Sequence, residues 1–177
     1  RLTFPEGWNF SQWRRHLEGV PQFADSRHLS DVQLVKTLGL DISHPEGWFF
    51  PDTYSYTGGD SIADLLLRAH RKMLDTLDKA WLLKAKDLPY SSAYEALIMA
   101  SIVEKETGLA AERAAIAGVF VRRLRLGMRL QTDPTVIYGL GNQFSGNLRR
   151  SHLKQKTVYN TYVIGGCLLY TSDAADE

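Results

Sequence analysis

Hydrophobic residues recur at helical spacing along most of this chain, and the polar positions between them predict where each helix begins and ends. An amphipathic stretch, with a charged face opposite an apolar stripe, predicts a long helix that starts at residue 60 or 61 and runs to about 84. A stretch that is apolar on nearly all sides predicts a helix over 92–107, and a second follows over 110–126. Shorter periodic stretches predict helices over 11–18 and 31–38.

β-branched and aromatic residues dominate two short stretches, 2–4 and 157–164, and this composition is typical of strands. No linker or internal repeat interrupts the pattern, so we place no domain boundary inside the chain. With 177 residues, 44% of them hydrophobic, the chain can bury a substantial core. The pattern therefore predicts an α+β fold, a mainly helical single domain with a few short strands.

The ends of the apolar helix carry recognisable signals. Ser91 or Ser92 is a candidate N-cap, and Glu95 stands three residues after Ser92, as in a capping box. Gly108 fits the position after the helix, where a left-handed residue commonly ends it. The predicted helix therefore runs from Ser92 to Thr107.

Two carboxylates, Glu104 and Glu106, lie in the last turn of this apolar helix. Burying a charge costs roughly several kcal/mol unless it is paired or neutralised, so a carboxyl group here would favour its protonated form, as a general acid requires. Residues two apart on a helix lie about 200° apart, so the two carboxylates cannot face one substrate atom. If one faces a cleft, the other faces the core or a cation such as Lys105 or Arg113. The alternative is a pair of ordinary surface charges.

Four segments together resemble one protein family. They are residues 100–107 (ASIVEKET), 123–139 (RLRLGMRLQTDPTVIYG), 159–162 (YNTY) and 46–54 (EGWFFPDTY). In this order and at these lengths they are similar to the MltG (YceG-like) endolytic murein transglycosylases, and the resemblance covers most of residues 1–164. The chain departs from the family at Arg122, where we expect Asn.

The resemblance implies an enzyme of the bacterial cell envelope that cuts nascent peptidoglycan glycan strands internally. It would cleave the β-1,4 bond between N-acetylmuramic acid and N-acetylglucosamine without adding water, leaving a 1,6-anhydromuramyl end, with Glu106 as the catalytic acid. Glycan strands and peptidoglycan synthases are the implied partners. The implied location is the inner (cytoplasmic) membrane, with the catalytic domain on its periplasmic side. A single membrane helix and a small LysM-like region should precede Arg1.

The chemistry of one carboxylate agrees with this family. Most glycosidases need two carboxylates, whereas a lytic transglycosylase can work with one, because the C6 hydroxyl of the sugar is the nucleophile. Two other functions stay open from the residues alone. One is a hydrolytic muramidase in which Glu106 is the acid and Asp133 activates water. The other is a non-catalytic glycan-binding scaffold module.

Further substrate contacts are predicted around Glu106, on segments that look like loop or strand. Tyrosine rings stack on sugars and polar groups bind sugar hydroxyls, although core packing explains each tyrosine equally well. Asp133-Pro134 is also a common helix start, and Glu104 fits a structural partner better than a second catalyst. The predicted substrate-binding residues are Glu104, Gln131, Asp133, Tyr138, Tyr159, Asn160 and Tyr162.

Several classes of function are disfavoured. The five histidines show no metal-ligand spacing, so we predict no metal, and no motif indicates a cofactor. The net charge of +1 argues against nucleic-acid binding, and the arginines of 122–125 are predicted to form a solvated helix face.

The last segment, residues 167–177, looks foreign to the rest of the chain. Its sequence, CLLYTSDAADE, matches the translation of a transposon-type sequencing adaptor. We therefore predict a partial YceG-like catalytic domain over 1–166 and a non-native tail over 167–177. The tail holds three acidic and no basic residues, so without it the net charge changes from +1 to +4.

Overall fold

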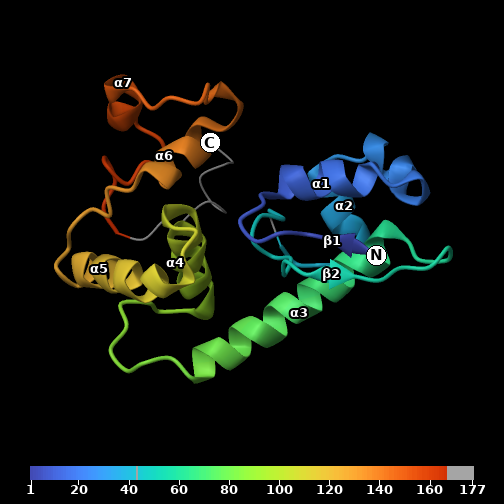
Figure 1. Ribbon diagram of the computed structural model, residues 1–177, viewed down its shortest axis with the longest axis horizontal. Coiled ribbons are helices and arrows are strands. Elements are labelled where there is room, and N and C mark those ends of the chain that lie inside the picture. Colours follow the sequence, from blue (N-terminus) through green and yellow to red (C-terminus); the bar gives the residue numbers. More distant parts are fainter. Residues whose placement is uncertain (43, 167–177) are drawn as a thin grey trace. The chain divides into compact units, whose positions relative to one another are not determined.

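The computed structural model describes residues 1–42 and 44–166, so the predicted tail, 167–177, lies outside the described residues. Helices dominate and one short sheet is present, which confirms the predicted mainly helical α+β class (Figure 1). Contacts within the chain group it into two compact units that divide between Leu83 and Lys84. The single domain expected from the sequence thus comprises an N-terminal unit, residues 1–83, and a C-terminal unit that begins at Lys84.

The N-terminal unit combines a two-stranded antiparallel sheet with helices. Leu2 pairs with Tyr54 across the sheet, so the first strand and a segment some fifty residues later close the unit. The predicted strand over 2–4 is confirmed. The elements of this unit are β1 (Leu2–Thr3), α1 (Phe10–Glu18), the 3₁₀ helix η1 (Pro21–His28), α2 (Asp31–Thr37), β2 (Thr53–Tyr54) and α3 (Ile62–Leu82).

Side-chain caps start the helices of the N-terminal unit. Helix α1 begins after Asn9, whose side chain accepts from the backbone of Gln12, so Ser11 is not the start. Ser30 caps α2 in the same way, and Ser61 caps α3. The predicted helices over 31–38 and from 61 to about 84 are therefore confirmed to within two residues.

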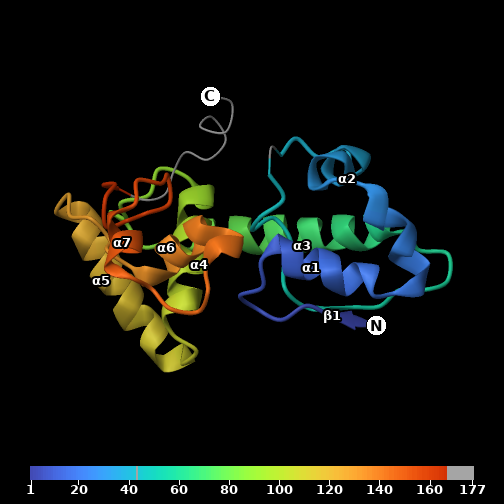
Figure 2. The ribbon, with the colours of Figure 1, turned by 90° about the horizontal axis from the view of Figure 1, so that it is seen from above.

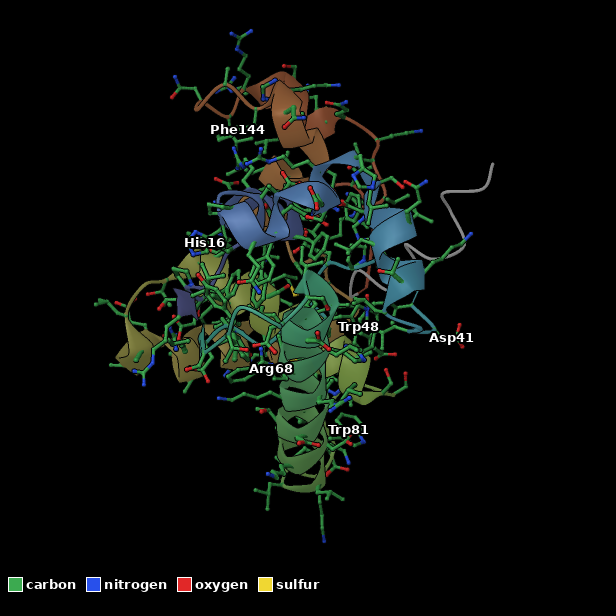
Figure 3. The ribbon with its side chains drawn as sticks, turned by 90° about the vertical axis from the view of Figure 1, so that its right-hand side faces the viewer. His16, Asp41, Trp48, Arg68, Trp81 and Phe144 are labelled. Atoms are coloured by element: carbon green, nitrogen blue, oxygen red, sulfur yellow. The ribbon has the colours of Figure 1, made fainter. Side chains whose placement is uncertain are left out.

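The core of the N-terminal unit forms on the first half of α3. Leu65, Leu66 and Ala69 are fully buried there, and the ring of Phe4 stacks on Trp13 with centroids 3.8 Å apart. The apolar stripe continues along α3 but loses its cover, since Trp81 is only half-buried. In Figure 3, Trp81 lies lower along this helix than Arg68.

The C-terminal unit is built around α4, which packs against both α5 and α6 (Figures 1 and 2). Its buried face, Met99, Ile102 and Val103, meets Phe120 of α5 and Leu130 of the following loop. The elements of this unit are α4 (Ala93–Glu106), η2 (Ala110–Glu112), α5 (Arg113–Arg125), α6 (Asp133–Leu140), η3 (Gly141–Gln143) and α7 (Arg150–Lys154).

Helix α4 agrees with the prediction in its extent and in its N-cap at Ser92, but not in its other end signals. Ser92 caps it by accepting from the Glu95 backbone, whereas the Glu95 carboxylate bonds Ser91 instead of completing a capping box. The helix stops because Thr107 is extended, with φ −146°. The prediction of a left-handed Gly108 is wrong, since the positive-φ glycines of the described residues do not include it. The predicted stop of the next helix at Gly127 is confirmed by its φ of 66°.

The predicted strand over 157–164 is wrong, because these residues form turns. Asn160 is the cause: its side-chain amide donates to the carbonyls of His152, Leu153 and Gln155, at 3.2, 3.2 and 2.7 Å. Its side-chain oxygen accepts from the backbone of Tyr162 at 3.0 Å. One buried amide thus satisfies backbone groups that a neighbouring strand would otherwise satisfy.

Candidate active site

Glu106 is the last residue of α4, and its carboxylate projects toward the start of α6. The Oγ1 hydroxyl of Thr132, the residue before α6, donates a hydrogen bond to Glu106 Oε1. The contact joins residues 26 apart in sequence. Among residues 1–42 and 44–166, Glu106 has no ion pair, and its hydrogen-bond partner is a hydroxyl and not a cation.

The two carboxylates in the last turn of α4, Glu104 and Glu106, face different neighbours, as their spacing predicted. Glu104 makes an ion pair with Arg113 of α5, with Oε2 3.0 Å from Nη2. Both residues line an apolar groove of about 470 Å³ between α4 and α5, and Glu106 does not line it. The expectation that a catalytic glutamate here would be buried is wrong: Glu106 is exposed, and the buried glutamate of α4 is Glu95.

Two other buried threonines, Thr135 and Thr161, hold Thr132 in place. Thr132, Thr135 and Thr161 are 2%, 3% and 0% exposed. The Thr132 backbone N–H donates to Thr161 Oγ1 at 3.1 Å, and the Thr135 hydroxyl donates to the Thr132 carbonyl at 2.7 Å. The hydroxyl oxygens of Thr135 and Thr161 lie 2.8 Å apart. Both peptide groups of Thr132 are therefore bonded inside the fold.

Gln131, predicted to bind substrate, has an unusual backbone. Its φ is +55°, a left-handed conformation that is uncommon for a residue with a side chain and that clusters at functional sites. Arg123 of α5 stabilises it, because its Nη1 donates to the Leu130 carbonyl at 2.7 Å and to Gln131 Oε1 at 3.2 Å. The prediction of a solvated helix face is therefore wrong for Arg123, because its side chain is bonded to the loop that leads to Thr132.

Asp133 and Tyr162 meet beside Glu106. The Tyr162 hydroxyl donates to Asp133 Oδ1 at 2.6 Å, and Arg129 Nη1 donates to the Tyr162 carbonyl at 3.0 Å. The hydrogen bond to Asp133 raises the pKa of Tyr162 to about 12, with further contributions from burial and from the negative charges of Asp133 and Glu106. Both carboxylates therefore act on one tyrosine.

The remaining predicted residues occupy two different settings. Tyr138 lies on α6 rather than on the predicted loop or strand, is 41% exposed, and meets Tyr159 edge to face with ring centroids 4.9 Å apart. Asp133 likewise belongs to α6, at its start. Asn160 is 1% exposed, and its amide is fully used by the turn described above. These bonds give Asn160 a structural role, and its contact with substrate stays a prediction.

The sequence pattern did not predict the contacts that Thr132, Thr161 and Arg123 make at this site. Each lies inside or beside a segment that carried the family resemblance, and that position was the available signal. A threonine next to Asp-Pro looks like an ordinary helix start, so its bond to Glu106 could not be read from the pattern.

Two further findings concern metal ligands and membrane-spanning helices. Within the part of the chain that the structure describes, no group of three or more His, Cys, Asp or Glu side chains could hold a metal ion. In that same part, none of the helices combines the length and apolar character needed to cross a membrane.

Comparison with known proteins identifies the family. The model of the YceG-like family matches residues 1–168, and the chain belongs to this family. It is 36% identical over 137 residues to the endolytic murein transglycosylase of Bacillus subtilis, covering 77% of this chain and 38% of that protein. It is 38% identical over 99 residues to the protein of the same name from Streptococcus pneumoniae D39, covering 54% of this chain and 17% of that one.

A solved structure agrees with the fold. The crystal structure of a yceG-like protein from Listeria monocytogenes superposes with a TM-score of 0.73 at 32% sequence identity. The match covers 94% of this chain and 59% of the Listeria chain. The chain thus spans well under two thirds of the length of each of these relatives.

Proposed function

We propose that this chain belongs to an endolytic lytic transglycosylase of peptidoglycan, in which Glu106 is both general acid and general base. The observation that carries the proposal is the setting of Glu106: an exposed carboxylate at a helix end, bonded through one oxygen to a buried hydroxyl. The names of the Bacillus and Streptococcus relatives support the same activity.

The reaction needs one proton donor and no water. Protonated Glu106 gives its proton to the glycosidic oxygen as the bond from that oxygen to C1 of N-acetylmuramic acid breaks. The positive charge that develops at C1 is stabilised by the acetamido group of the same sugar. Glu106, now a carboxylate, takes the proton from the C6 hydroxyl while its oxygen bonds to C1. The 1,6-anhydro ring forms, and Glu106 is again protonated.

The neighbouring residues would bind the sugars. Gln131 and Asp133 are exposed polar groups on either side of Thr132, and the rings of Tyr138, Tyr159 and Tyr162 are at least partly accessible. Such rings stack on sugar faces, and such polar groups bind hydroxyl and acetamido groups.

Glu104 has a different role in this proposal. Its ion pair with Arg113 makes it a structural partner of α5, on the groove that Glu106 does not line. We therefore assign it to the packing of α4 on α5 and not to the sugar at the scissile bond.

A hydrolytic muramidase is the second candidate, and one observation favours it. Asp133 and Glu106 both act on Tyr162, so two carboxylates surround one tyrosine. Two carboxylates are what a hydrolase needs, one as acid and one to activate water. The Tyr162 hydroxyl, however, already occupies Asp133 Oδ1.

The whole protein would act at the cell envelope. The proposed substrate is the glycan strand of nascent peptidoglycan, and the proposed partners are the synthases that make it. We propose an inner-membrane location through a helix that precedes this segment, with the site on the periplasmic side.

Muropeptide analysis tests these proposals. Peptidoglycan is incubated with the protein joined to the flanking segments of the Bacillus relative, in parallel with its Glu106→Gln and Asp133→Asn variants. Anhydromuramyl ends that are lost in Glu106→Gln and retained in Asp133→Asn support the transglycosylase. Reducing ends, heavier by one water molecule and lost in both variants, establish the muramidase. Absence of cleavage, with retained binding to glycan strands, leaves a scaffold module and overturns both.

A further inference from the structure

The hydroxyl of Thr132 occupies a particular place in the site. Among the described residues, it is the hydrogen-bond partner of the Glu106 side chain. Thr132 is 2% exposed, whereas Glu106 is exposed. A carboxylate held by such a rigid group is restricted in a way that an exposed glutamate ordinarily is not.

The buried threonines form a closed circuit of hydrogen bonds that begins and ends on the peptide groups of Thr132. A hydroxyl has one proton, and that of Thr135 is given to the Thr132 carbonyl. Thr161 Oγ1 also lies 3.5 Å from that carbonyl, but the 2.7 Å bond from Thr135 is much shorter, so we assign the proton of Thr161 to its 2.8 Å bond with Thr135. The Thr161 oxygen accepts from the Thr132 N–H, which closes the circuit. The circuit therefore fixes the Thr132 backbone without using the Thr132 hydroxyl.

The direction of the remaining bond follows from the same count. An ionised carboxylate has no proton, so Thr132 Oγ1 must donate to Glu106 Oε1. When Glu106 is protonated, the hydroxyl oxygen can accept, because it keeps two lone pairs. One hydroxyl can thus hold Glu106 in both of the states through which a general acid and base passes.

We propose that Thr132 is the positioning residue of Glu106: it anchors Oε1, so that Oε2 transfers the proton. The threonine circuit supplies the rigidity, since it ties Thr132 to Thr135 of α6 and to Thr161 of the following turn. The kinetic part of this inference rests on the proposed function, whereas the contact itself does not.

The kinetic test compares two substitutions at one position. Thr132→Val keeps the shape but removes the hydroxyl, and Thr132→Ser keeps the hydroxyl. We expect Thr132→Val to lower kcat by about 10- to 100-fold with KM changed less than about two-fold, and Thr132→Ser to recover most of the loss.

Thr135→Val is the matched control. It opens the buried circuit but keeps the Thr132 hydroxyl on Glu106, so it should lower the melting temperature and lower kcat less than Thr132→Val does. If Thr132→Val and Thr135→Val lose activity in proportion to stability, and Thr132→Ser rescues nothing, Thr132 is only structural and the inference is overturned.

A spectroscopic readout separates this inference from the proposed function. The side-chain carboxyl carbon of Glu106, labelled with ¹³C and assigned by its absence in Glu106→Gln, should shift in Thr132→Val and return in Thr132→Ser. That result supports the anchoring contact even if the protein cleaves no glycan. An unchanged resonance in Thr132→Val overturns the contact even if Glu106 proves to be the catalytic acid.

Discussion

The two compact units use their carboxylates for different purposes. In the N-terminal unit, both oxygens of Glu46 accept from the backbone N–H of Phe10 at the start of α1, and Asp52 pairs with Lys72 of α3. In the C-terminal unit, Glu106 has a hydroxyl partner and an exposed position. Glu104, also in the C-terminal unit, pairs with the cation of Arg113. The comparison therefore teaches that carboxylates bonded at helix ends or to cations serve the fold, whereas Glu106 has one oxygen left for the proposed chemistry.

The charges of the two units differ in sign as well. Residues 1–83 contain 9 Lys and Arg against 11 Asp and Glu, whereas residues 84–166 contain 12 against 6. The overall charge of +1 conceals this imbalance. Because the stem peptides of peptidoglycan carry carboxylates, a basic unit around Glu106 would favour association with such strands, most strongly at low salt.

The largest expected effect comes from exchanging glutamate for glutamine in each unit. Glu106→Gln should lower turnover by about 10³-fold or more, because in the proposed reaction one residue serves as acid and base, while the melting temperature stays unchanged. Glu46→Gln is the matched substitution. It should leave turnover intact and lower the free energy of unfolding by about 0.5–1 kcal/mol, through a weaker cap on α1. Turnover and thermal melting measured on both variants decide the matter, and loss of turnover in Glu46→Gln would contradict the division of roles.

Core truncation should separate the units by location. Leu65 of α3 is 0% exposed and Met99 of α4 is 3% exposed, and they belong to different hydrophobic clusters. Replacing either by alanine should cost about 2–5 kcal/mol. Hydrogen exchange should then rise mainly in 1–83 for Leu65→Ala and mainly in 84–166 for Met99→Ala. A uniform rise across both ranges for either variant would show that the units unfold as one.

Helix caps give a smaller contrast. Ser61 accepts from the Asp64 backbone and its hydroxyl also donates to the Asp64 carboxylate at 2.6 Å, whereas Ser92 accepts only from the Glu95 backbone at 3.3 Å. Both alanine variants should be destabilised by about 1 kcal/mol, with Ser61→Ala the more affected. Denaturant unfolding of the two variants provides the comparison, and an equal or reversed order would mean that the reciprocal bond adds no stability.

The smallest effect concerns pH. The bond to Asp133 raises the pKa of Tyr162 to about 12, so the stability it provides is complete below the ordinary tyrosine value of 10 and is lost as the pH rises through about 12. In the N-terminal unit, burial likewise raises the pKa of Tyr54, but bonds from Lys72 and Ser61 have the opposite sign, because they lower the pKa of Asp52 and Asp64. The stability that these two provide is lost as the pH falls below their ordinary value of 3.8.

Tyr162→Phe tests this difference. The variant should lose less stability than the parent between pH 10 and 12. Unfolding followed by circular dichroism at each pH measures this loss. An equal loss in the variant and the parent would contradict the contribution of the bond to Asp133.

Local signals predicted the helices well because periodicity and caps are local. Ser92 and Ser61 start their helices as predicted, and the extents of α4 and α5 follow from the spacing of apolar residues. The false strand over 157–164 arose because β-branched composition favours a strand only when a partner strand exists. Asn160 supplies the competing bonds from within its own turn, and composition does not reveal such bonds.

The candidate site was predicted only in part. Glu106 was found because an acidic residue on an apolar helix is conspicuous and because the surrounding segment resembles a family. Its partner Thr132 was not found, because their contact depends on how α4 packs against α6. The expected burial of Glu106 was wrong for the same reason: a residue at a helix end is covered only if another element reaches it.

The amide of Asn160 also determines where the chain can vary in length. It bonds the carbonyls of His152, Leu153 and Gln155 to the turn that carries Thr161, and none of these three bonds uses the path between Gly141 and Asn147. Residues 141–143 and 145–147 are exposed, and such loop tips tolerate insertions. Evolution can lengthen this loop, and an experimenter can place a fluorescent tag in it, while the threonine circuit keeps its register.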